Sequence, residues 1–127
     1  MTTDQIQKNL SIIQTELDKE VSSNNIVEVE EKLMNLATYM GLSAECMRHT
    51  KANILDKQKQ LSDFVIKNTQ LSATNLKFVL EGKMKDELTL HMYAERLNAA
   101  LAHCSDSLLS ILSKYKEELR VSRYATH

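Results

Sequence analysis

Residues 103–107 bring together a histidine, a thiol, an acid and two hydroxyls, in the order His103, Cys104, Ser105, Asp106 and Ser107. Such groups serve nucleophilic catalysis when a nucleophile, a base and an orienting acid converge on one reacting atom. Consecutive helical residues point about 100° apart, so this run cannot form a self-contained triad on a helix. We expect Cys104 to pack as a small hydrophobe and His103 to lie with Asp106 on a polar face. We therefore assign no catalytic residue and expect no enzyme.

Two other groups have residue types that bind metals. Glu87, His91 and Glu95 recur every four residues, and Glu45 and His49 form a similar pair. Helical di-metal sites use a Glu-x-x-His spacing and zinc proteases use His-Glu-x-x-His, and the chain has neither pattern. We expect ordinary ion pairs, no metal and no cofactor.

Charge is distributed unevenly although the net charge is only -1. Residues 1–45 carry eight acids and three bases, whereas residues 46–85 carry three acids and eight bases. The basic segment supplies the candidate nucleic-acid contacts, namely Arg48, Lys51, Lys57, Lys59 and Lys67. The alternative is that these bases are solvated or paired with the acidic first segment. Few aromatic residues are present for base stacking, and lysines outnumber arginines, so sequence-specific readout has little support.

Composition favours long helices in a single domain spanning residues 1–127. The chain has no proline and only two glycines, Gly41 and Gly82, so it lacks most residues that break helices. Cys46 and Cys104 are too few for a disulfide scaffold, and we expect reduced thiols. Because no leader pattern and no apolar run of about 20 residues is present, we expect a cytoplasmic protein without a membrane partner.

Apolar spacing places a helical hairpin in the first forty residues. The first stripe consists of Ile6, Leu10, Ile13 and Leu17; a turn at residues 22–25 follows it, and then a second stripe over residues 26–40. Thr3 is the expected N-cap of the first helix, and Gly41 is the expected C-terminal cap of the second. A third helix, capped by Ser43, is then expected from about Ala44. Near residues 68–75 we expect it either to break, giving a short helix before Gly82, or to continue in distorted form.

The strongest periodicity lies in the last third of the chain. We call it the seam; its steps alternate between four and three through Leu90, Ala94, Leu97, Leu101, Cys104, Leu108, Ile111 and Tyr115. A second apolar flank adds Ala102, Leu109, Leu112 and Leu119. A helix from Lys83 to Arg120 would be about 57 Å long, which predicts an elongated molecule. We predict an all-α fold in which the hairpin precedes long antiparallel helices of an elongated bundle, and a homo-oligomer that covers the apolar flanks.

Two blocks resemble a known group of proteins. The segment "AERLNAALAHCSDSLLSILSKYKEEL", preceded by "TNLKFVLEGKMKDEL", is similar to the C-terminal half of small all-helical accessory proteins of tailed phages and prophages. The resemblance covers residues 74–120. It implies an accessory protein of a kind often encoded beside DNA recombination or replication genes, with no settled catalytic role, and it transfers no functional residue to this chain. Near Leu109 the chain departs from the arginine that family members often carry.

These observations favour a non-enzymatic helical interaction protein that self-associates through the seam, in phage or prophage DNA metabolism. The alternative is a nucleic-acid-binding accessory protein that uses the basic central segment. A third class is a small inhibitor of a host enzyme or defence complex, with the acidic hairpin mimicking nucleic acid. The partner, the pathway and the oligomer number stay open at this level.

Overall fold

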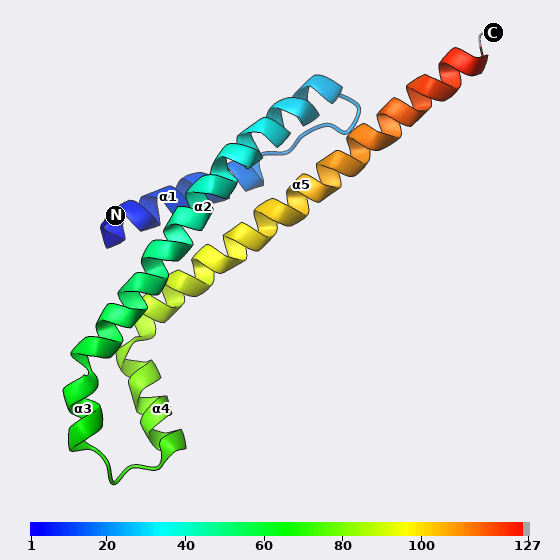
Figure 1. Cartoon of the computed structure of the whole chain (residues 1–127). Helices are drawn as coiled ribbons and strands as arrows, with labels where there is room; N and C mark the ends of the chain where they lie inside the picture. The colour runs from blue at the N-terminus through cyan, green and yellow to red at the C-terminus, as the bar shows by residue number, and fades with distance from the viewer. Residues whose placement is uncertain (126–127) are drawn as a thin grey trace.

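The computed structural model describes residues 1–125 and contains no strand within that range. Its helices are α1 (Thr3–Asp18), α2 (Ile26–Gln60), α3 (Ser62–Lys67), α4 (Ala73–Lys83) and α5 (Lys85–Ala125). In Figure 1, α2 and α5 run antiparallel, α1 crosses α2 in the upper half of the view, and α3 and α4 form a hairpin at the opposite end. At about 1.5 Å per residue, the 41 residues of α5 extend roughly 62 Å. The predicted all-α, elongated helical bundle is confirmed.

The start of α1 is fixed by a reciprocal pair of hydrogen bonds. Thr2 Oγ1 accepts from the Gln5 amide at 3.2 Å, and Gln5 Oε1 accepts from the Thr2 amide at 2.7 Å. This capping box satisfies two amides that the first helical turn leaves without partners. The N-cap is therefore Thr2, one residue before the predicted Thr3. The predicted apolar stripe of α1 is confirmed, because Ile6, Leu10 and Ile13 are fully buried.

The end of α1 is held by a lysine from α2. Lys32 is only 6% exposed, and its Nζ donates to the carbonyl oxygens of Glu16, at 3.0 Å, and of Lys19. These carbonyls lie at a helix C-terminus, where the backbone lacks internal donors and the helix dipole favours a cation. The chain turns over residues 22–25 as predicted, and the Asn25 side chain caps α2 by accepting from the Glu28 amide at 3.2 Å.

Helix α2 runs without interruption through Gly41, so the predicted cap at Gly41 and the new helix at Ala44 are wrong. Glycine costs about 1 kcal/mol relative to alanine inside a helix. Core packing outweighs that penalty, because buried residues lie on both sides of Gly41, at Leu36 and Cys46. Ser43 is accordingly not an N-cap; it is fully buried and donates to the Met40 carbonyl at 3.0 Å.

The core joins α1, α2 and α5, and most of the seam belongs to it. Ala94, Leu97, Leu101 and Leu108 are at most 7% exposed and pack with the buried residues of α1 and α2. Three further seam residues, Leu90, Cys104 and Ile111, are partly buried against the same cluster. Tyr115, at 39% exposed, lies outside it. The seam is thus used largely within one chain.

The α3–α4 hairpin contributes little to this core. The helix breaks between Lys67 and Ala73, which is the first of the two alternatives that the sequence left open, and Ser72 caps α4 by accepting from the Asn75 amide at 3.2 Å. A second break, at Leu61, was not predicted. Neither α3 nor α4 buries a side chain, and Phe78 is 78% exposed. The hairpin therefore stands apart from the bundle at a neck where α2 ends and α5 begins (Figure 1).

Candidate interaction surface

Residues 103–107 lie on different sides of α5 and do not converge. Cys104 packs partly against the core, while His103, Asp106 and Ser107 are exposed. The Ser107 hydroxyl donates to the His103 carbonyl at 3.1 Å, an ordinary bond within the helix. This geometry contains no nucleophile activated by a neighbouring base.

A second stripe on α5 is only partly covered. It lies one position beyond the seam and follows the same alternation of three and four through Ala102, Ser105, Leu109, Leu112, Lys116, Leu119 and Arg123. Leu109 is 51% exposed and Leu119 is 47% exposed, whereas Ala102 and Leu112 are partly buried. The sequence had singled out the apolar members of this stripe as a second flank. Inside a single chain, that flank has no complete cover.

The C-terminal part of α5 extends beyond the helix that pairs with it. Asn98 donates to Ser43 at 2.6 Å, and Thr50 contacts His91 at 2.7 Å, which fixes the antiparallel register of α2 and α5. In that register the start of α2 lies at about the level of Tyr115, so the following ten residues project roughly 15 Å further. All residues from Ser113 to Tyr124 are exposed. These residues bury little surface within the chain, so the projecting end would gain stability from packing against a partner.

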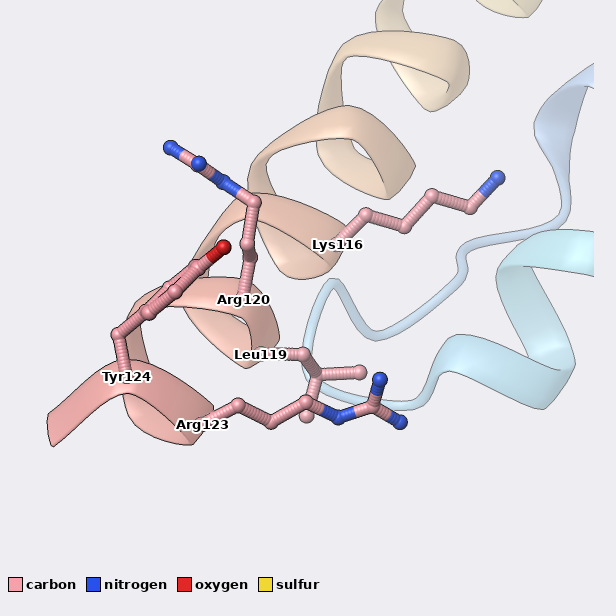
Figure 2. Close-up of a pocket in the computed structure, with 5 residues that line it drawn as sticks. All are labelled: Lys116, Leu119, Arg120, Arg123 and Tyr124. Atoms are coloured by element: carbon pink, nitrogen blue, oxygen red, sulfur yellow. The ribbon is translucent and has the colours of Figure 1, made fainter. Parts of the chain in front are cut away.

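Basic and apolar side chains meet on this projecting end. Figure 2 shows Lys116, Leu119 and Arg123 on one side of the helix and Arg120 with Tyr124 on another. They border an open hollow of about 450 Å³. Arg120 donates to Glu117 at 2.6 and 3.2 Å, and its guanidinium lies 5.9 Å from the centre of the Tyr124 ring. These contacts hold Arg120 on a flank of the second stripe.

The predicted nucleic-acid contacts do not form one surface. Helical spacing puts Arg48, Lys51 and Lys59 on one outer face of α2, where all three are exposed. Lys57 lies on the opposite face of α2, beside Asn53 and Glu87, and Lys67 lies beyond the break in α3.

Within residues 1–125, Glu45 makes all the ion pairs that join the acidic segment to the basic one, and it lies on α2 beside the basic segment. Arg48 pairs with Glu45 on its own helix at 2.8 Å, and this hydrogen-bonded guanidinium lowers the pKa of Glu45. In the same range, no ion pair links the basic segment to the acids of the first hairpin, on α1 or at the start of α2. Pairing of the basic segment with the acidic hairpin therefore has no support there, and solvation is the remaining alternative.

His91 belongs to a polar layer between α2 and α5. Its Nε2 lies 2.7 Å from Glu95 Oε1, and its Nδ1 lies 2.7 Å from the Thr50 hydroxyl. The Thr50 hydroxyl donates its proton to the Met47 carbonyl at 3.0 Å, so its oxygen is the acceptor toward His91 Nδ1. Thr50 is 1% exposed, which withholds its oxygen from substrates. Histidine, threonine and glutamate thus cross-link two helices here.

The candidate metal residues do not assemble a coordination site. His49 contacts Glu45 at 3.6 Å, and His91 contacts Glu95, each pair within a single helix. In the part of the chain that the structure describes, no three histidine, cysteine or acidic side chains come together in a way that could hold a metal ion.

The two cysteines differ in environment, and this difference predicts their reactivity. Cys46 is fully buried, and loss of hydration raises the pKa of its thiol, whereas Cys104 is partly exposed. We expect iodoacetamide at pH 8 to alkylate Cys104 well before Cys46, as measured by mass spectrometry of native protein over time. Both should react at similar rates in urea. Equal rates in the native protein would contradict the burial of Cys46.

None of the helices within residues 1–125 combines the length and apolar character required to cross a membrane.

Comparison of the chain with protein-family models, curated proteins and solved structures gives no match.

Proposed function

We propose that this protein is a non-enzymatic helical interaction protein that self-associates through the second stripe of α5. The observation that carries the proposal is the exposure of Leu109 and Leu119, on either side of the partly buried Leu112, on a helix that extends beyond its bundle. Apolar side chains recurring on one exposed helical face favour pairing with another helix. The resemblance to phage accessory proteins supports placing this activity in phage or prophage DNA metabolism.

The sequence predicted self-association through the seam, whereas this proposal places the contact on the second stripe. Leu101 and Leu108 are buried between helices of one chain, so a second chain could reach them only after the bundle opened. Leu109 and Leu119 need no such rearrangement. Self-association through the second stripe therefore requires less free energy than self-association through the seam, because the bundle does not have to open.

We predict that the double variant Leu109→Glu/Leu119→Glu stays folded and loses self-association. Each glutamate would place a charge in an apolar contact, so dimerisation should weaken at least about 100-fold. Sedimentation velocity over a range of protein concentrations measures the effect, and circular dichroism checks the fold. Leu55→Glu is the matched control, because Leu55 lies on α2 and is also 51% exposed. Wild-type protein that stays monomeric at every concentration would refute the proposal.

A second candidate, nucleic-acid binding, is favoured by the outer face of α2. Arg48, Lys51 and Lys59 lie along about 16 Å of that face, within reach of successive phosphates of one strand. Binding of a single-stranded oligonucleotide that weakens steeply with salt, and is lost in Lys51→Glu/Lys59→Glu, would favour this candidate over the first.

A further inference from the structure

The second stripe contains charges that restrict how two copies can meet. Lys116 and Arg123 interrupt its apolar positions, and both lie in its C-terminal half. If two α5 helices paired in parallel and in register, each of these cations would face its own copy. Like charges at directly opposed positions repel, so parallel pairing is disfavoured.

An antiparallel arrangement removes this repulsion. Centred near Lys114, it sets Leu109 opposite Leu119 of the second copy, and Leu112 opposite Lys116. The alkyl stem of a lysine can cover leucine while its ammonium stays in water. Arg123 then faces the small Ser105. Leucine thus meets leucine at two symmetric positions, and no cation meets its own copy.

Charges beside the stripe favour the same arrangement. Asp106 and Arg120 occupy equivalent flanking positions two heptads apart, and both are exposed. In the antiparallel register Asp106 of each copy lies near Arg120 of the other, which produces two symmetric ion pairs. Arg120 is already oriented by Glu117, so little side-chain entropy remains to be lost.

We propose that the partner of the second stripe is another copy of this chain, docked antiparallel about a two-fold axis near Lys114, with Asp106 and Arg120 paired across the interface. This inference rests on the proposed self-association and adds its geometry. A closed two-fold contact uses the same surface on both copies, as a self-complementary stripe requires. The contact involves one helix per copy, about 27 Å long over residues 105–123, so we expect a weak dimer with a micromolar dissociation constant.

A charge-exchange experiment on the full chain tests the geometry. Asp106→Arg alone puts the introduced guanidinium against Arg120 of the other copy, and Arg120→Glu alone puts two acids together. Each variant should dimerise about 10-fold more weakly than wild type in sedimentation velocity at low salt. A 1:1 mixture should regain dimers, because both inter-chain pairs are then of opposite charge. Lys77→Glu, which reverses an exposed charge on α4, away from α5, should dimerise as wild type does.

The outcomes separate the geometry from the proposed function. Weaker dimerisation of each single variant, together with recovery of dimers in the 1:1 mixture, supports antiparallel docking. A wild-type dimer that neither substitution weakens, or a mixture that does not recover, overturns the antiparallel geometry and leaves self-association standing. A wild-type protein that never dimerises overturns both. Circular dichroism of each variant excludes unfolding as the cause of a lost dimer.

Discussion

Replacing Leu101 with glutamate should unfold the protein or leave it only marginally folded. Leu101 is fully buried where α5 meets α1 and α2, so the carboxylate would be buried without a partner in the centre of the core. The cost of about 5 kcal/mol is comparable to the entire stability of many domains. Urea unfolding followed by far-ultraviolet circular dichroism measures it.

A milder variant and a matched control make this prediction quantitative. Leu101→Ala should fold and lose about 2–5 kcal/mol, because the cavity that it leaves can close only in part. Leu109→Glu, on the same helix but 51% exposed, should change the stability of the monomer by no more than about 0.5 kcal/mol. If the two glutamate variants were equally stable, the assignment of the seam to the core would be wrong.

The second large effect is expected at the polar layer between α2 and α5. Thr50→Val leaves His91 Nδ1 without the hydroxyl that lies 2.7 Å away. His91→Leu removes the ring that contacts both Thr50 and Glu95. Each single substitution should lower the free energy of unfolding by about 1–3 kcal/mol, since a partly buried polar group loses a hydrogen bond.

The double variant separates the interaction itself from the loss of packing. In Thr50→Val/His91→Leu both polar groups are gone, so the total loss should be about 1–2 kcal/mol smaller than the sum of the single losses. Urea unfolding of the four proteins at one pH completes the cycle. Strictly additive losses would mean that the Thr50–His91 contact does not stabilise the fold.

Apolar spacing was sufficient to predict the helices whose buried positions form unbroken stripes. Ile6, Leu10 and Ile13 predicted α1, and Leu97, Leu101 and Leu108 predicted the buried face of α5, because a period between three and four is specific to helices. Local residue types were a weaker guide at Gly41. There, packing on both sides of the glycine overrode its preference for a helix end.

The candidate surface was predictable only in part, because a stripe does not reveal which chain covers it. Apolar spacing identified both the seam and the second flank of α5, and the seam, which is the more regular of the two, was predicted to mediate self-association. In the structure the seam packs inside the bundle instead, because the small residues Ser43 and Cys46 on the buried face of α2 allow α5 to approach closely. The buried role of Lys32 carried no sequence signal, because its partners are backbone carbonyls 13 and 16 residues away.

The neck at Leu61 and Met84 also bears on how the chain could be divided. The segment between Asn68 and Ser72 is the connection farthest from the core, and the hairpin that carries it buries no side chain in α3 or α4. Cleavage there would give one fragment with α1 and α2 and another with α5, each exposing an apolar face that fits the other. The fold is thereby suited to being split into two halves that reassemble, with the hairpin as the place to insert a tag or a second domain.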